Sequence, residues 1–189
     1  AFGLFIASEE IVSSLFGYGS FTKSDVTNTS LALMYFSLGV PAFALIKVLS
    51  SFYFARDNTK TPFYISLFSM TTNVIISLIF FREYGFVIIP IATTLSSWLS
   101  VSLYFILFSK SKIIILNNKN FINIYKIILA TALMCFFLHF GLEYFEDKLQ
   151  YTNKFKLIYL LTMIGLSTVI YLFITNIQGI LKLESYKLK

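Results

Sequence analysis

The sequence has few charged residues for its size: of its 189 residues, 13% are charged and 57% are hydrophobic. A soluble domain typically carries about 25% charged residues, because a folded chain in water needs polar atoms on its surface. The composition therefore excludes an ordinary water-soluble domain. It favours a protein whose surroundings are themselves apolar.

The chain also lacks the residues that metal and redox sites need, since it has one cysteine and one histidine. The single thiol, Cys135, excludes an internal disulfide and a cysteine-rich metal site, and we expect it to fill a small apolar space in a helix. His139 has no metal-ligand pattern around it, so we expect an interfacial position. No nucleophile elbow, HExxH motif, Walker A motif or glycine-rich phosphate loop occurs. The sequence predicts no enzyme activity and no organic cofactor.

The net charge of +6 does not indicate nucleic-acid binding. The basic residues lie between apolar runs and form no basic stripe, which is the pattern of loops in a membrane protein. Nine of the fifteen Lys and Arg residues fall on the side that holds the 56–61 loop, the 110–120 loop and the C-terminus, and five fall on the other side. The positive-inside rule therefore predicts a cytoplasmic C-terminus.

What the sequence has instead is long apolar runs. A helix needs about 20 mostly apolar residues to cross about 30 Å of hydrocarbon, and five runs reach that length. A sixth, at the N-terminus, is shorter and contains Glu9 and Glu10, so we expect a truncated first helix and a chain that continues an earlier part. We predict an all-α bundle of about six transmembrane helices, over about 1–16, 24–56, 62–81, 86–109, 121–142 and 155–178.

A few polar residues inside these runs are the candidates for function. Lys47 lies deep in the second run, where a charge costs about 2.5–3.5 kcal/mol on insertion scales. It either faces a polar cavity and meets an anionic headgroup, or it snorkels to the interface as a structural lysine. Asn73 and Ser77 share one helix face, and Thr93 lies on the next helix. Their oxygens could hold a hard cation such as Na⁺, but ordinary interhelical hydrogen bonding needs the same residues.

Two prolines and a tryptophan also lie within the runs. Pro41 and Pro90 each remove a helical hydrogen bond and permit a kink, a device used where helices line a cavity. Trp98 lies in the middle of its run, where packing is the expected role.

Four segments in order, 15–22, 35–49, 52–62 and 91–99, resemble the MurJ/MviN family of lipid II flippases, part of the multidrug/oligosaccharidyl-lipid/polysaccharide exporter superfamily. The resemblance implies a fourteen-helix protein with two lobes around a central cavity. This chain would supply the truncated ninth helix to the fourteenth, as one C-terminal transmembrane lobe over 1–189. The other lobe would be its partner.

The resemblance also implies a function and a set of sites. The family flips lipid II, an undecaprenyl-diphosphate-linked peptidoglycan precursor, across the bacterial cytoplasmic (inner) membrane by alternating access. Its last two helices hold the polyprenyl tail in a groove, and its Na⁺ ligands match Asn73, Ser77 and Thr93, with Ser77 where other members have a carboxylate. The candidates for that groove here are Phe136, Phe137, Phe140 and Tyr171, with Gly165 leaving room beside them.

Together these patterns predict a part of a lipid II flippase in which Lys47 attracts the diphosphate. Two alternatives stay open. One is a related exporter of another lipid-linked oligosaccharide or of drugs, and the other is a membrane scaffold that does not transport.

Overall fold

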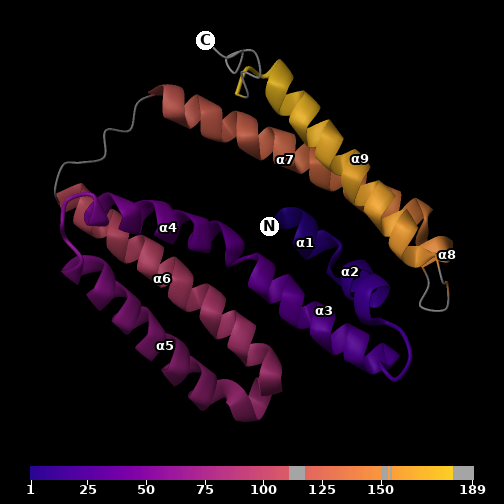
Figure 1. The fold of residues 1–189 in the computed structure, drawn as a ribbon, viewed down its shortest axis with the longest axis horizontal. Coiled ribbons are helices and arrows are strands. Elements are labelled where there is room, and N and C mark those ends of the chain that lie inside the picture. Colours follow the sequence, from indigo (N-terminus) through magenta and orange to yellow (C-terminus); the bar gives the residue numbers. More distant parts are fainter. Residues whose placement is uncertain (111–117, 150–152, 154, 181–189) are drawn as a thin grey trace. The chain divides into compact units, whose positions relative to one another are not determined.

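The computed structural model describes residues 1–110, 118–149, 153 and 155–180 (Figure 1). Its described residues form helices and turns without any strand, so the predicted all-α fold class is confirmed. The chain separates into two compact units. The first is mainly Thr27–Ile115, and the second is mainly Ile6–Val26 with Leu116–Lys189.

The first unit contains most of α3 (Lys23–Ser37), then α4 (Val40–Phe54), α5 (Lys60–Tyr84) and α6 (Ile88–Lys110). A single 3₁₀ turn, η1 (Gly85–Val87), joins α5 to α6 and reverses the chain. Gly85 begins it at φ +58°, a conformation that costs glycine little. Figure 1 shows α6 between α4 and α5, so α6 is the helix against which both others pack.

Aromatic side chains form the core at one end of the first unit. Tyr104 and Phe108 of α6 are buried there together with Ile65 of α5. The ring of Phe108 lies 4.9 Å from that of Phe52 and 5.2 Å from that of Tyr53, centroid to centroid. Such tilted and edge-on ring pairs add to the stabilisation that comes from packing alone.

The second unit is built on an antiparallel pair, α7 (Asn118–Tyr144) and α9 (Lys156–Ile177) (Figure 1). The short helices α2 (Ser8–Phe16) and α8 (Glu146–Leu149) also belong to this unit. The first helix, α1 (Phe2–Ile6), is divided between the two units. The core of the second unit combines Ala7 with Leu138 and Leu142 of α7, Leu149 of α8 and Leu160 of α9. α7 and α9 pack closely at Gly141, where a Cβ would lie 3.0 Å from the Met163 sulfur.

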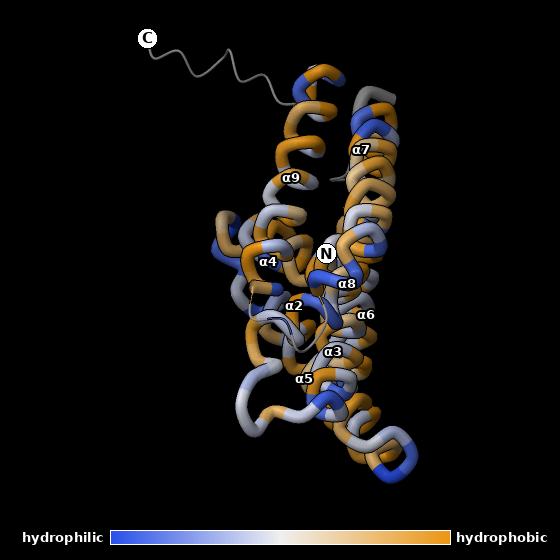
Figure 2. The backbone as a smooth tube through the Cα atoms, turned by 90° about the vertical axis from the view of Figure 1, so that its right-hand side faces the viewer, coloured by the Kyte–Doolittle hydropathy of each residue, from blue (hydrophilic) through white to orange (hydrophobic). Residues whose placement is uncertain are grey.

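The helices carry their apolar side chains outward, as a protein in lipid must. Four stretches are long and apolar enough to cross a membrane: Lys23–Phe54, Lys60–Ser109, Phe121–Tyr144 and Lys156–Ile177. The second folds back at η1 into α5 and α6, so these stretches supply five passes. Figure 2 shows hydrophobic residues along the lengths of the helices and hydrophilic ones gathered near turns and ends. A multi-pass membrane protein is therefore confirmed.

The ends and breaks of the helices follow from particular residues. A capping box begins α3, in which Asp25 Oδ2 accepts from the Thr22 N–H (2.8 Å) and the Asp25 N–H donates to Thr22 Oγ1 (3.3 Å). The helix predicted over 24–56 corresponds to α3 and α4, which are separated by a break just before Pro41, where a kink was expected. Pro90 makes no interior kink, because it is the third residue of α6, where helices accept proline readily.

Candidate functional site

The break between α3 and α4 is the most specific local feature of the first unit. The Gly39 N–H donates to Phe36 O at 2.9 Å instead of reaching back to Tyr35 O, and Pro41 has no N–H to donate to Ser37 O. At this break the carbonyls of Tyr35 and Leu38 have no helical N–H partner among the described residues. In hydrocarbon no water can replace them, so another part of the protein must.

Two side chains of α6 supply those partners. Thr94 Oγ1 donates to Tyr35 O at 2.9 Å, and Trp98 Nε1 donates to Leu38 O at 3.0 Å. Trp98 was expected only to pack. Its hydrogen bond depends on the fold, which places α6 beside the break. One turn of α6 thus holds the break in place through two hydrogen bonds.

Gly39 lets α6 come this close. A Cβ at Gly39 would lie 2.9 Å from Thr94 Oγ1 and 3.0 Å from the tip of the Phe43 ring. Both distances are shorter than an ordinary van der Waals contact between such atoms. Gly39 and Pro41 together therefore define the break, the first by allowing close approach and the second by interrupting the helix.

The structure brings the three predicted Na⁺ ligands together. The Asn73 amide nitrogen donates to Thr93 Oγ1 at 2.9 Å, and Ser77 Oγ donates to Asn73 Oδ1 at 3.4 Å. Thr93 Oγ1 donates in turn to Ile89 O. Asn73 and Thr93 also line a cavity of about 340 Å³ between α5 and α6.

This arrangement serves as interhelical hydrogen bonding in its own right. Hard cations prefer several oxygen ligands, often carboxylates, whereas Thr93 here faces an amide nitrogen and the three side chains include no carboxylate. These three side chains, hydrogen-bonded to one another as they are, do not fit the ligand set of a cation. A Na⁺ site on these residues stays a prediction.

Lys47 is exposed on α4, seven residues before its last residue, Phe54, which is about 10 Å at about 1.5 Å per residue. Its carbonyl accepts from the hydroxyls of Ser50 (3.1 Å) and Ser51 (2.7 Å). Its ammonium group makes no hydrogen bond or ion pair with any described residue. The lysine is thus available to an external anion, and its role in a substrate cavity stays a prediction.

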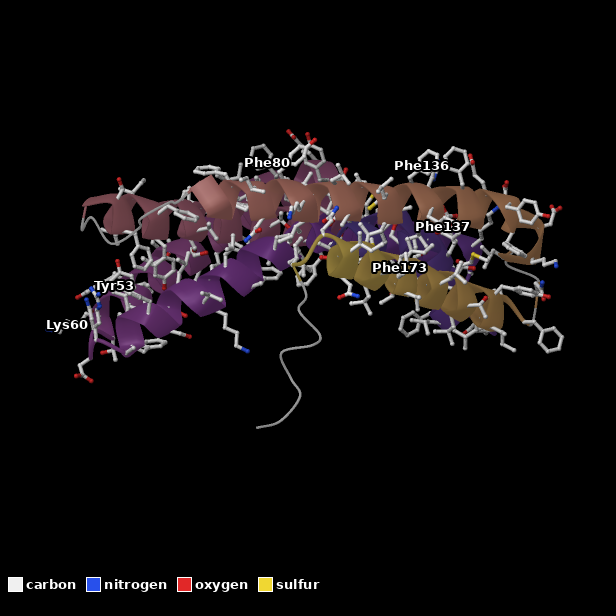
Figure 3. The ribbon with its side chains drawn as sticks, turned by 90° about the horizontal axis from the view of Figure 1, so that it is seen from above. Tyr53, Lys60, Phe80, Phe136, Phe137 and Phe173 are labelled. Carbon is white, nitrogen blue, oxygen red and sulfur yellow. The ribbon has the colours of Figure 1, made fainter. Side chains whose placement is uncertain are left out.

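The predicted lipid-tail residues divide into groups. Phe136 and Phe140 are exposed on α7 with ring centroids 4.4 Å apart. Figure 3 shows Phe136 and the half-exposed Phe137 projecting from α7 in different directions. The phenylalanines therefore offer an apolar surface on α7.

Gly165 and Tyr171 of α9 do not share one side of their helix. Gly165 lies two residues from both Met163 and Ser167, about 160–200° around α9 from the side that packs on α7. Tyr171 is four residues after Ser167 and half-buried on that packed side. Gly165 and Tyr171 are therefore separated around α9, and a tail site on the five residues stays a prediction.

Glu9 and Glu10 line a cavity of about 430 Å³ in the second unit together with His139, Glu143 and Glu146. Glu10 Oε2 is buried without a hydrogen-bond partner among the described residues. His139 Nε2 lies 4.0 Å from Glu143 Oε1, one helical turn away. We missed this carboxylate in the sequence, although its four-residue spacing is a readable signal.

Two lysines of the second unit hold helix ends, and neither was predicted to. Lys156 is fully buried, donates to Gly17 O at 2.9 Å and lies 4.3 Å from the centroid of the Tyr18 ring. Lys126 donates to Gln178 O at 2.8 Å. Gly17 and Gln178 are the C-terminal caps of α2 and α9, where a cation is favoured by the helix dipole.

Comparison with known proteins identifies the family of this chain. The family model described as "Lipid II flippase MurJ" matches residues 1–173. The chain belongs to the MurJ family. This confirms the resemblance read from the four segments.

Individual MurJ relatives agree. The chain is 30% identical over 178 residues to the probable lipid II flippase MurJ of Vibrio cholerae, covering 94% of this chain and 34% of that protein. It is 32% identical over 147 residues to the probable lipid II flippase MurJ of Rickettsia prowazekii, covering 76% of this chain and 29% of that protein.

A solved structure also matches, "Lipid II flippase MurJ, inward closed conformation", with a TM-score of 0.72 and 29% identity. That match covers 93% of this chain and 34% of the solved chain. The chain thus spans about a third of the length of the MurJ proteins it matches.

Proposed function

We propose that this chain works as the C-terminal transmembrane part of a flippase that moves lipid II across the bacterial cytoplasmic membrane. The observation that carries the proposal is the MurJ family match over residues 1–173. The apolar helices support a substrate that travels within the bilayer. The remaining two thirds of the relatives' length would supply the other lobe and most headgroup contacts.

The break between α3 and α4 supports alternating access as the mechanism. Conformational changes of this kind need positions where a helix can bend without exposing unpaired backbone groups to the lipid. Here the freed carbonyls are already held by Thr94 and Trp98. Bending at this point therefore exchanges two side-chain hydrogen bonds instead of unwinding a helix.

Substrate contacts in the proposal divide between charge and apolar surface. Lys47 attracts the diphosphate, because its ammonium group is exposed and makes no hydrogen bond or ion pair with any described residue. The aromatic pair of Phe136 and Phe140 offers a surface for the isoprenoid tail.

The driving force would be an ion gradient or the membrane potential, which is worth about 2.3 kcal/mol per charge per 100 mV. No step is assigned to Na⁺, because Asn73, Ser77 and Thr93 pair with one another. The excess of basic residues on the side of the 56–61 loop supports a cytoplasmic C-terminus.

Complementation tests the proposal. The complete product of the gene would be expressed in cells whose own lipid II flippase is depleted, with Lys47→Ala and, as a matched control, Arg82→Ala, an exposed cation of the same unit. We expect rescue by the parent and by Arg82→Ala, and at least a tenfold loss of viable cells with Lys47→Ala at equal membrane abundance.

Two results would change the proposal. No rescue by a correctly inserted parent would refute lipid II flipping and favour an exporter of another substrate or a protein that does not transport. Rescue that ignores Lys47 would leave the flippase in place and make Lys47 a structural residue.

A further inference from the structure

A second cavity of the first unit, of about 640 Å³, lies at the turn between α4 and α5. Its lining includes Phe54, the last residue of one apolar stretch, and Lys60, the first residue of the next. Figure 3 shows Lys60 at the same end of the unit as Tyr53. The cavity therefore opens at the depth where the hydrocarbon of a bilayer meets its headgroups.

Tyr104 gives this cavity an unused hydrogen-bonding group. The side chain is 2% exposed, and its ring is fixed against that of Tyr53, with centroids 5.8 Å apart, and against Ile65. Its hydroxyl makes no hydrogen bond to any residue that the structure describes, although Tyr104 lines the cavity. The hydroxyl is not one of the buried, unpartnered polar atoms of the described structure. It therefore reaches open space beside the two cavities that Tyr104 lines and can donate to a ligand oxygen.

The mouth of the cavity is rich in donors. Lys60 forms no ion pair within the described ranges, and Thr59, the N-cap of α5, makes no side-chain cap hydrogen bond. Asn58 satisfies the Thr61 N–H at 3.1 Å, which leaves Thr59 and Lys60 free to meet a ligand. The positive end of the α5 dipole adds to the attraction for an anion.

The charge of the link limits which anion fits. Arg56 lies over the Phe52 ring at 4.2 Å, and Asp57 offsets one of the two cations, so the link carries a net charge of about +1. Apolar walls from Ile46 and Phe63 continue the cavity away from this charge. One negative charge on an apolar chain is the matching chemistry.

We propose that this cavity binds an anionic phospholipid of the surrounding leaflet. Its phosphodiester would lie against Lys60 and Thr59, an ester oxygen would accept from Tyr104, and the start of an acyl chain would contact Ile46 and Phe63. A diphosphate lipid shares the phosphate and the apolar chain but carries more charge than a single lysine matches. The proposal needs only a membrane protein and does not rest on lipid II as the transported substrate.

Native mass spectrometry of the complete gene product in detergent tests this site. The protein would be titrated separately with phosphatidylglycerol, phosphatidylcholine and undecaprenyl diphosphate, and the bound fraction measured for each lipid. Lys60→Gln removes the charge, Tyr104→Phe removes the hydroxyl and keeps the ring, and Arg82→Gln removes a matched cation at the other end of α5.

We expect Lys60→Gln to weaken phosphatidylglycerol binding about fivefold, as one juxtamembrane basic residue contributes about 1 kcal/mol. Tyr104→Phe should weaken it about threefold, and Arg82→Gln less than 1.5-fold. Equal effects of Lys60→Gln and Arg82→Gln would overturn the proposal. Preferred binding of undecaprenyl diphosphate that depends on Lys60 would also overturn it and assign the cavity to a diphosphate lipid.

Discussion

Substituting Gly39 and Gly165 by alanine should have opposite effects, although the chemical change is the same. At Gly39 the new Cβ would lie 2.9 Å from Thr94 Oγ1, 3.0 Å from the Phe43 ring and 3.2 Å from Phe36 O. At Gly165 the new Cβ would have no atom within 4 Å apart from its chain neighbours and the nearby backbone of its own helix. The first substitution must therefore displace α6 or rotate Thr94 away from Tyr35 O, and the second displaces nothing.

The magnitudes follow from these contacts. Inserting one methyl group into a packed site costs about 1–3 kcal/mol, offset by about 0.4–1 kcal/mol because alanine restricts the unfolded chain. Gly39→Ala should therefore destabilise the protein by about 1–2 kcal/mol. Gly165→Ala, in the interior of α9, should stabilise it by up to about 1 kcal/mol, the helix preference of alanine over glycine.

Thermal unfolding in detergent or bicelles, followed by circular dichroism, would measure both variants. For a chain of this size, 1 kcal/mol corresponds to about 2–4 °C in the midpoint. We expect the midpoint to fall by a few degrees for Gly39→Ala and to stay or rise for Gly165→Ala. Equal shifts in the two variants would refute the close packing of α6 against the helix break.

Three further substitutions test the contacts described above. Trp98→Phe should leave Leu38 O without its donor and lower the stability of the protein by about 0.6–1.7 kcal/mol, the range for hydrogen bonds between membrane helices. Denaturant unfolding, compared with Trp98→Tyr, measures the loss of stability. No loss would exclude the hydrogen bond. Lys156→Met should unfold at least about 3 °C lower, because Gly17 O loses its buried donor. Arg82→Met is the exposed control, and equal midpoints would refute the contact. Asn73→Ala should lower the stability of the protein by about 1 kcal/mol, with and without Na⁺. Thermal unfolding at several Na⁺ concentrations measures this, and stabilisation of the parent alone by Na⁺ would instead show a cation site.

The apolar runs predicted the helices well, because the length of a hydrophobic run and its polar boundaries are local properties of the sequence. The break at Gly39 was hidden by the same property, since 24–56 is apolar on both sides of it. Pro41 suggested a kink, but the partners of the freed carbonyls come from residues 94 and 98, about 60 positions away. Only the fold could bring them there.

The sites were less predictable than the helices. Asn73, Ser77 and Thr93 were expected to meet, and they do, because spacing on α5 and the tight turn into α6 fix their approach. Gly165 and Tyr171 were grouped through the family resemblance. They face different sides of α9, which the angular spacing of 100° per residue would have shown.

The sequence did not predict the surroundings of Lys156. This lysine was counted only among the basic residues of one membrane side, yet it is fully buried in the described structure. A lysine can lie there because a carbonyl at a helix end and an aromatic face replace water around it. Nothing in the local sequence marks that partnership, since Gly17 and Tyr18 precede it by about 140 residues.

The most direct test of the account measures the movement of lipid II itself. Cells depleted of their own flippase would express the complete gene product, and the amount of lipid II exposed on the outer face of the cytoplasmic membrane would be followed over time. We expect exposure at near the rate of undepleted cells and at least a tenfold slower rate with Lys47→Ala. Lipid II that stays on the inner face, despite correct insertion of the parent protein, would contradict it.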